Sequence, residues 1–281
     1  MDVRNAIKFM LLSTMAFACM NSIVKYLLHI GTFQIVFFRA IGSLFLAFGF
    51  LYKNKISFKG NNKKILILRG VFGLTSLVLF FMSSKYMPIG TAVSIRYLAP
   101  IFAAMFAIYL LNERIKPIQW LFFLIAFSGV VVLKGFDTQI NSYGLMLAIL
   151  SAVFSGLVYV VLSKIGKSEH PVVVVFYFML IATIVGGLLS LGNWVNPIGW
   201  DWVLLFSLGI FGYFGQIYMT KAFQLASANF VAPLKYIEVV FTVLLGLFLF
   251  SEIYTLWSIL GMLLIILGLV LNVLFKSKTK A

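Results

Sequence analysis

Residues 96–113 read RYLAPIFAAMFAIYLLNE, and residues 235–252, which lie 139 positions later, read KYIEVVFTVLLGLFLFSE. Each stretch starts with a cation and a tyrosine, continues as a long apolar run and ends with a glutamate. Each is followed by a further apolar run with a late glycine, Gly129 in the first copy and Gly268 in the second. The same features in the same order predict a duplicated chain. In membrane proteins, paired halves of this kind usually hold a substrate site between them.

The composition places this chain in a lipid bilayer. Hydrophobic residues make up 63% of the 281 residues and charged residues 10%, with a mean hydropathy of +1.09, which leaves too little polar surface for a water-soluble globule. A run of about 18–22 apolar residues crosses a hydrocarbon layer of about 30 Å as a helix. Lipid admits helices because an open strand edge would leave backbone groups unsatisfied. The predicted fold class is an all-α polytopic membrane protein with ten transmembrane helices, near residues 5–28, 33–52, 65–84, 89–111, 118–135, 143–163, 171–191, 201–221, 229–250 and 255–275.

The net charge of +15 is distributed unevenly between the two sides of these predicted helices. Most of the 22 Lys and Arg residues fall at the side that holds both termini, including the basic segment 53–64. This bias predicts a multi-pass membrane protein with both termini in the cytoplasm. The basic segment would meet anionic lipid headgroups, so we expect no nucleic-acid partner. Three cations lie at the other side (Lys25, Lys85, Lys134) and four lie within helices (Arg39, Arg69, Arg96, Lys235).

Five helices per half make the second copy run upside down relative to the first. The helix near 89–111 would run from outside to inside, and its counterpart near 229–250 from inside to outside, which is an inverted-topology repeat. We therefore expect a first repeat over residues 1–136 and a second over residues 142–276, with the segment between them as a hinge.

Prolines and glycines mark predicted bends and close contacts. Pro100 and Pro233 fall inside corresponding helices of the two halves, where a proline frees a carbonyl and bends the helix. Bent helices that meet near the midplane make a cavity. Glycines such as Gly42, Gly49 and Gly209 let helix backbones approach closely in lipid.

Charges inside a bilayer are costly enough that each requires a reason. Arg39 either extends its long side chain to the outer surface or lines a cavity. Arg96 lies deeper and one turn before Pro100, so we expect it to line a cavity. Lys25, close to a helix end, is expected to be an interfacial anchor.

Lys235 and Glu238 are three residues apart and would share one helical face, close enough to pair. One interpretation is a structural salt bridge inside the bundle. The other makes Glu238 a proton carrier or amine partner and Lys235 a partner for a carboxylate or phosphate. Burial favours the protonated form of a carboxylic acid, which would suit proton exchange.

Several further polar side chains are candidates for the same cavity, although aromatic residues in membrane helices are more often packing residues. Glu113 and Glu252, at opposite faces, are expected to be helix caps or loop contacts. The cavity candidates are Asn21, Tyr97, Tyr213, Gln216, Tyr218 and Tyr236.

An enzymatic function is not expected. The chain has one cysteine, Cys19, and two histidines, His29 and His170, and it has no paired carboxylates. These residues offer no nucleophile paired with a general base, so we predict no catalytic residue, no metal site and no cofactor.

The motifs around Pro100 and Pro233 resemble the EamA-type members of the drug/metabolite transporter superfamily. In that family each repeat carries an apolar-proline run that ends in a glutamate, here residues 92–113 and 231–252. Arg39 matches a position where the family often has arginine. The chain departs from the family at Val239, where a proline is usual, and Pro233 would then supply the bend.

The resemblance implies secondary transport of a small metabolite by alternating access across the bacterial inner membrane. Three potential cavity cations against one acid favour a substrate with a carboxylate, a phosphate or another electron-rich group. Export of an amino-acid-like metabolite is the first hypothesis. Uptake of a nucleoside-like cofactor, such as S-adenosylmethionine or a vitamin, is the second.

The rival from another class is a non-transporting membrane scaffold or lipid-handling protein. The expected partners are a small-molecule substrate and the lipid bilayer. A homodimer is one assembly that the sequence allows.

Overall fold

The apolar runs form helices that lie side by side. Within the described part of the chain, nine helical segments are long and apolar enough to cross a membrane, with Ile89–Leu110 counted as one, and Ile237–Phe250 is a shorter apolar helix. This arrangement confirms the predicted all-α polytopic class with ten helices. The computed structural model describes residues 3–110, 116–136, 140–165, 168–225 and 234–278.

Apart from the run predicted near 229–250, whose start lies outside the described residues, the helices begin and end within a few residues of the predicted runs. Pro117 and Pro171 occupy the first positions of their helices, where the missing N–H group costs no hydrogen bond. The helices are α1 (Val3–Tyr26), α2 (Thr32–Lys53), α3 (Lys63–Ser83), α4 (Ile89–Arg96), α5 (Ala99–Leu110), α6 (Pro117–Phe136), α7 (Ser142–Ile165), α8 (Pro171–Ser190), α9 (Trp200–Leu225), α11 (Ile237–Phe250) and α12 (Leu256–Lys278), with one 3₁₀ turn at Leu191–Asn193.

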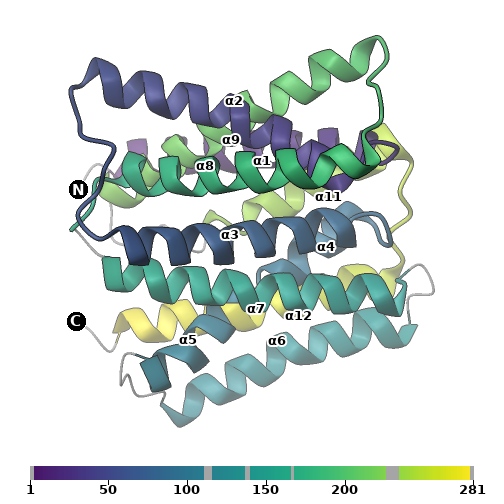
Figure 1. Cartoon of the computed structure of the whole chain (residues 1–281). Helices are drawn as coiled ribbons and strands as arrows, with labels where there is room; N and C mark the ends of the chain where they lie inside the picture. Colours follow the sequence, from purple (N-terminus) through teal and green to yellow (C-terminus); the bar gives the residue numbers. More distant parts are fainter. Residues whose placement is uncertain (1–2, 111–115, 137–139, 166–167, 226–233, 279–281) are drawn as a thin grey trace.

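With α4 and α5 taken together as one crossing, successive helices run in opposite directions through the bundle, as Figure 1 shows. We call the end where α1 begins and α12 ends the terminal end, and the opposite one the far end. The connection from α2 to α3 lies at the terminal end, and the connection from α3 to α4 lies at the far end (Figure 1).

The principal contacts join one half of the chain to the other. α1 packs on α9 and α3 on α7, while α2 packs on α8 and α6 on α12. An offset of 139 residues makes α1, α2, α3 and α6 equivalent to α7, α8, α9 and α12. Exchanging the halves therefore converts the α1–α9 contact into the α3–α7 contact, and it leaves the α2–α8 and α6–α12 contacts unchanged. The two inverted five-helix repeats predicted from sequence are confirmed.

The helix predicted near 89–111 is broken in two, which corrects the expectation of one bent helix. α4 ends at Arg96, Tyr97 and Leu98 form a turn, and α5 begins at Ala99. Pro100 is the second residue of α5, and a proline cannot donate to the carbonyl four residues before it, here that of Arg96.

A second break lies at the equivalent place in the other half. Lys235 and Tyr236 form a turn just before α11 begins at Ile237. Pro233, the other predicted bend, lies outside the described residues. The cation and tyrosine that open the two repeated stretches thus mark a break in each half.

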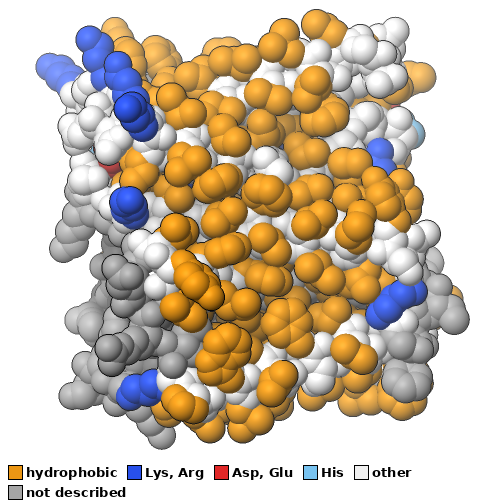
Figure 2. Space-filling view, turned by 60° about the horizontal axis from the view of Figure 1, so that its bottom comes forward, with side chains coloured by type: hydrophobic (Ala, Val, Ile, Leu, Met, Phe, Trp, Pro, Cys, Tyr) orange, Lys and Arg blue, Asp and Glu red, His pale blue; other side chains and the backbone are white. Residues whose placement is uncertain are grey.

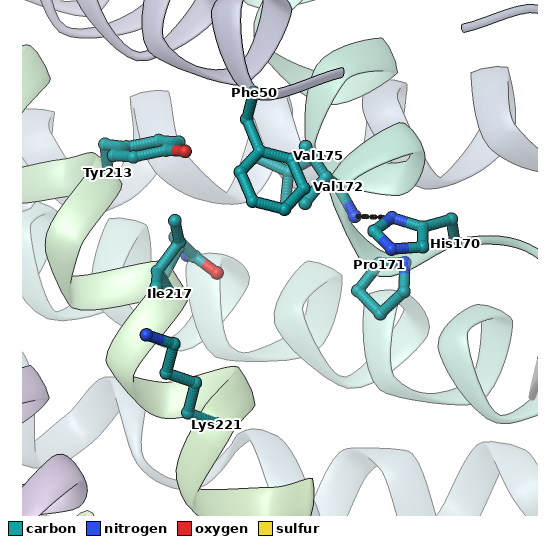
Figure 3. Close-up of a pocket in the computed structure, with 9 residues that line it drawn as sticks. Phe50, His170, Pro171, Val172, Val175, Tyr213, Ile217 and Lys221 are labelled. Carbon is teal, nitrogen blue, oxygen red and sulfur yellow. Dashed lines mark hydrogen bonds between the residues drawn. The ribbon is translucent and has the colours of Figure 1, made fainter. Parts of the chain in front are cut away.

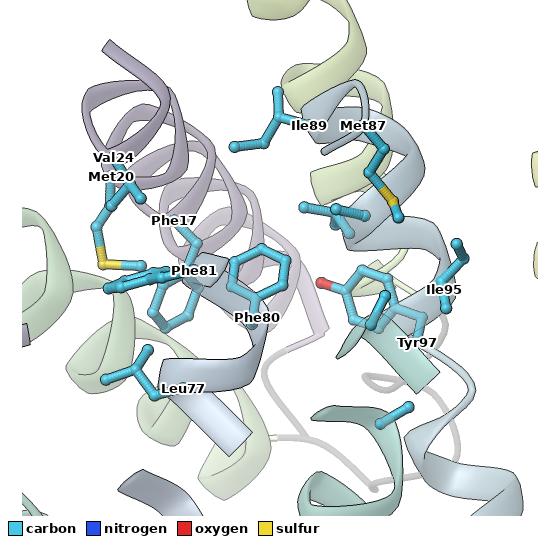
Figure 4. Packing of buried hydrophobic residues seen from close by; sticks show 14 of the residues in the cluster. Phe17, Met20, Val24, Leu77, Phe80, Phe81, Met87, Ile89, Ile95 and Tyr97 are labelled. Carbon is cyan, nitrogen blue, oxygen red and sulfur yellow. The ribbon is translucent and has the colours of Figure 1, made fainter. Parts of the chain in front are cut away.

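A large apolar cluster fills the centre of the bundle around the first break. Phe80 and Phe81 of α3 are each 1% exposed, and Leu98 is fully buried. In Figure 4, Tyr97 points its hydroxyl toward Phe80, with Phe17 of α1 beyond it. The surface is apolar too: on the face in Figure 2, hydrophobic side chains cover the middle, while Lys and Arg side chains lie toward its two ends. Such a belt is the surface that lipid tails would contact.

Candidate functional site

Glu238 is held between the two halves of the molecule. Its Oε2 accepts a hydrogen bond of 2.6 Å from the hydroxyl of Tyr97, in the turn between α4 and α5. Its Oε1 accepts one of 3.1 Å from the side-chain amide of Asn21 on α1. The carboxylate belongs to the second half and both donors belong to the first. The break in α4–α5 is what brings Tyr97 to the first turn of α11.

A cavity of about 60 Å³ lies beside Glu238. It is smaller than the roughly 300–1,000 Å³ of most small-molecule sites, so a metabolite requires the halves to move apart. Both halves supply its polar lining: Asn21, Arg39, Arg96 and Tyr97 come from the first, and Tyr159, Gln216, Lys235 and Glu238 from the second.

The three predicted cavity cations all reach this cavity, which we call the central cavity. Arg39 on α2 is 3% exposed, so the alternative in which it extends to the outer surface is wrong. The guanidinium carbon of Arg96 lies 4.5 Å from the ring centroid of Phe80. The ammonium of Lys235 lies 5.7 Å from the ring centroid of Tyr97. Contact with the face of an aromatic ring partly stabilises a desolvated cation.

The predicted pairing of Lys235 with Glu238 is not found among the ion pairs of the described residues. Lys235 lies in a turn rather than on the helix, so the expected shared helical face does not exist. The carboxylate is bound instead by Tyr97, whose hydroxyl also lies 3.1 Å from the backbone carbonyl oxygen of Lys235. Tyr236 does not line the cavity, and its ring packs edge-on against that of Tyr97, with centroids 5.2 Å apart.

Lys25 is not a simple interfacial anchor, which corrects the sequence interpretation. Its ammonium lies 3.3 Å from Oε1 of Glu252 and donates to the backbone carbonyls of Ser84 and Met87 at 2.9 and 3.0 Å. The Glu252 carboxylate also accepts from the backbone N–H of Ile89 at the start of α4. Glu252 is thus a cap and loop contact, as predicted. Glu113, its counterpart, lies outside the described residues.

A second cavity of about 170 Å³ opens between α2, α8 and α9, toward the terminal end. Figure 3 shows Phe50 of α2 over it, with Tyr213 and Lys221 of α9 and His170 before α8 around it. Tyr213, predicted for the central cavity, lies here instead. Tyr218 stacks on Phe9 and Phe214 and lines neither cavity.

Gln216 lines both cavities, which makes them neighbours. Of the residues that sequence reasoning missed, Tyr159 on α7 lines the central cavity. The repeat could have indicated it, because an offset of 139 makes Tyr159 equivalent to Met20, which lines the same cavity. Among the described residues, no group of three or more His, Cys, Asp or Glu side chains could hold a metal ion.

Comparison with known proteins agrees with this architecture. A solved crystal structure with 18% sequence identity superposes with a TM-score of 0.67, covering 99% of this chain and 97% of that one, which shows the fold alone. The pseudopaline exporter CntI of Pseudomonas aeruginosa is 29% identical over 270 residues, 95% of each chain.

Two other relatives are transporters or carriers by name. The human solute carrier family 35 member G1 is 31% identical over 92% of this chain and 76% of its own length. The S-adenosylmethionine uptake transporter of Rickettsia prowazekii is 27% identical over 88% of this chain and 85% of its own length. A profile of the EamA-like transporter family matches residues 4–134 and 142–274. This chain, a multi-pass membrane protein, therefore belongs to the EamA-like transporter family.

Proposed function

We propose that this protein is a secondary-active transporter that moves a small polar metabolite by alternating access, and that it exports an amino-acid-like metabolite. The observation that carries the proposal is the position of Glu238. The carboxylate of one half is bound by Tyr97 and Asn21 of the other, beside a cavity that both halves line with cations. A substrate that competes for these groups would loosen one half from the other.

The residues of the central cavity have distinct roles in this proposal. Arg39, Arg96 and Lys235 bind a carboxylate or phosphate group of the substrate, because guanidinium and ammonium groups give charge-assisted hydrogen bonds. Glu238 takes the substrate amine or the coupling proton, and Asn21 orients it. Gln216 contacts the substrate from a position that lines both cavities, and Tyr236 supports the ring of Tyr97.

Alternating access would come from the two halves moving against each other. We assign residues 1–136 and 142–276 to the two moving units, with breaks at equivalent positions next to the central cavity. Its volume of about 60 Å³ fits a closed form of the transporter. The exposed basic segment 53–64 at the terminal end supports both termini being in the cytoplasm of a bacterial cell, with the protein in the inner membrane.

Uptake of a nucleoside-like cofactor is the second candidate function. The relative named as an S-adenosylmethionine uptake transporter favours it, since that protein is similar over 88% of this chain. Export remains the first candidate because the relative named as a pseudopaline exporter aligns over 95% of this chain.

Transport by purified protein in proteoliposomes tests the proposal. Arg96→Ala and Glu238→Gln should each lower flux about tenfold or more, since a hydrogen bond to a charged group contributes about 1.5–3 kcal/mol. Lys64→Ala and Glu169→Gln are the matched controls, because both charges lie outside the central cavity. All variants must be inserted to wild-type levels. Normal flux in the Arg96 and Glu238 variants would overturn the site.

A thermal-shift screen against amino acids, nucleosides and cofactors separates transport from a scaffold or lipid-handling role. A ligand that binds only the folded protein raises its apparent stability. We expect at least one soluble metabolite to raise the unfolding temperature in wild type and less so in Arg96→Ala. A protein that responds to no soluble metabolite would favour the scaffold.

A further inference from the structure

Arg69 is a buried cation for which neither the sequence nor the central cavity provides a role. It lies on α3, is 7% exposed and does not line the central cavity. Its guanidinium carbon lies 4.3 Å from the ring centroid of Phe178 on α8. Arg39 approaches the same ring, with its guanidinium carbon 5.9 Å from the centroid. Two guanidinium groups from neighbouring helices thus share one aromatic ring.

These two arginines have donors with nothing to bind. Nη1 of Arg39 and both Nε and Nη1 of Arg69 are buried and have no hydrogen-bond partner among the described residues. Arg39 Nε donates a weak hydrogen bond to the sulfur of Met20, at 3.1 Å. A buried donor on a charged group is costly when it is left unpaired, and more so within a bilayer.

The described acids do not compensate these charges. Arg39 and Arg69 form no ion pair within the described ranges, where the recorded pairs are Lys25 with Glu252 and His29 with Asp201. Glu238 is bound by Tyr97 and Asn21. Glu169 accepts from the backbone N–H groups of Asn61 and Asn62 at the terminal end.

The repeat places Arg39, and with it the pair of Arg39 and Arg69, at the centre of the molecule. Arg39 and Phe178 are equivalent residues, 139 positions apart, and they contact each other, so the pseudo-twofold axis passes between them. Gly73 and Gly212 are equivalent too, and each leaves room for one guanidinium. A Cβ at Gly73 would lie 3.2 Å from Nη1 of Arg69, and one at Gly212 would lie 3.4 Å from Nε of Arg39. The substrate sites of inverted-repeat transporters lie near such an axis.

We propose that Arg39 and Arg69 form, around Phe178, a second subsite that binds a carboxylate or phosphate group of the substrate. Arg39 lines the central cavity and also contacts Phe178, so it joins this subsite to the group that faces Arg96 and Lys235. The substrate then carries at least two anionic groups. This inference rests on the proposed transport function and narrows its substrate class to dianionic metabolites.

Binding to the full-length protein in phosphatidylcholine nanodiscs tests the subsite. The probes are alanine with one carboxylate, glutamate and succinate with two, glycerol 3-phosphate, inorganic phosphate and S-adenosylmethionine. We expect the probes with two carboxylates to bind about tenfold or more tightly than alanine, glycerol 3-phosphate and inorganic phosphate, which each carry one anionic group, as one added charged contact would give. Arg69→Met should abolish this preference and leave the affinity for alanine within about twofold.

The apo protein supplies a readout that a merely structural Arg69 would not give. Methionine keeps an apolar side chain against Phe178 and removes an unpaired buried charge, so Arg69→Met should raise the unfolding temperature of the ligand-free protein. Lys64→Met, which removes an exposed cation at the start of the same helix, is the matched control. It should change neither the preference for two carboxylates nor the unfolding temperature.

Three results would overturn the subsite. The subsite loses its basis, with transport left intact, if wild type binds alanine as tightly as glutamate and succinate, or if Arg69→Met retains the preference for two carboxylates. An Arg69-dependent stabilisation by phosphatidylglycerol nanodiscs, with none by soluble dianions, would assign the arginines to a lipid headgroup instead. Failure of the proposed function is seen separately, as unchanged flux in Arg96→Ala and Glu238→Gln.

Discussion

The hydroxyl of Tyr97 lies 2.6 Å from Oε2 of Glu238, and this bond joins the broken helix of one half to the helix that follows the break in the other. Tyr97 is 7% exposed and Glu238 is 5% exposed, so water competes little for either group. The bond therefore holds the carboxylate and links the two halves beside the central cavity.

Tyr97→Phe should lower the initial rate of transport about tenfold, because it deletes this charge-assisted bond and keeps the aromatic ring. Tyr236→Phe is the matched control, since the ring of Tyr236 packs against that of Tyr97 while its hydroxyl does not bind Glu238. Initial rates of both variants in proteoliposomes check this. Equal rates for the two variants would show that the ring matters and the hydroxyl does not.

The ion pair of Lys25 with Glu252 should contribute measurable stability at the far end. It connects α1, the end of α11 and the loop between α3 and α4, and Glu252 is also bound by the hydroxyl of Tyr254 at 2.6 Å. A double-mutant cycle of Lys25→Met and Glu252→Gln, followed by thermal unfolding, should give a coupling free energy of about 1–3 kcal/mol.

Lys85→Met serves as the control for this ion pair. Lys85 lies in the same loop, and partial burial lowers the pKa of its ammonium, but it forms no ion pair with a described residue. Its replacement should cost little stability. A coupling near zero between Lys25 and Glu252 would mean that each acts only through its backbone contacts.

The sequence predicted the scaffold well because its signals are long and redundant. Each helix is an apolar run long enough to cross lipid, and the duplicated order of features paired the halves. The breaks escaped prediction because the apolar pattern continues through Tyr97 and Leu98 without interruption. One continuous helix, bent at its proline, was therefore expected in each half, and Lys235 was assigned to the same helical face as Glu238.

Sequence analysis predicted only those site residues that stand out by their charge and by their depth in the bilayer. Arg39, Arg96, Lys235 and Glu238 meet at one cavity because a cation or an acid within a bilayer requires a polar environment. Partners across helices could not be predicted, because they depend on the contact of α1 with α9 and α11, which no local pattern encodes. Lys25 was misassigned for this reason, and the contact of Arg69 with Phe178 was missed.

Gly209→Ala should destabilise the contact between α2 and α9. A Cβ at Gly209 would lie 2.7 Å from Cα of Gly42, which is backbone and cannot move aside as a side chain can. Overpacking of this kind costs about 1–3 kcal/mol. Thermal unfolding of the purified protein measures the loss.

Gly49→Ala is the matched control for this contact on α2. Gly49 was predicted to lie in a close contact too, but a Cβ there would meet nothing within 4 Å, so that prediction is wrong. Alanine at this helical position should leave stability unchanged or raise it by up to about 1 kcal/mol, since glycine is a weak helix former. Equal losses in both variants would refute close backbone packing as the cause.

Glu238→Gln should separate exchange from proton-driven flux. Glutamine keeps the shape of the side chain and can still bond to Asn21 and Tyr97, but it cannot gain or lose a proton. In proteoliposomes, a gradient of about one pH unit supplies about 1.4 kcal/mol per proton, which should change the initial rate in wild type. The variant should lose this response while retaining measurable substrate counterflow, at a rate lower than that of wild type. Asn21→Ala removes a bond to the same carboxylate while leaving it titratable, so its flux should remain pH-driven even if it is slower. A variant at Glu238 that follows the gradient as wild type does would place the coupling proton on another group.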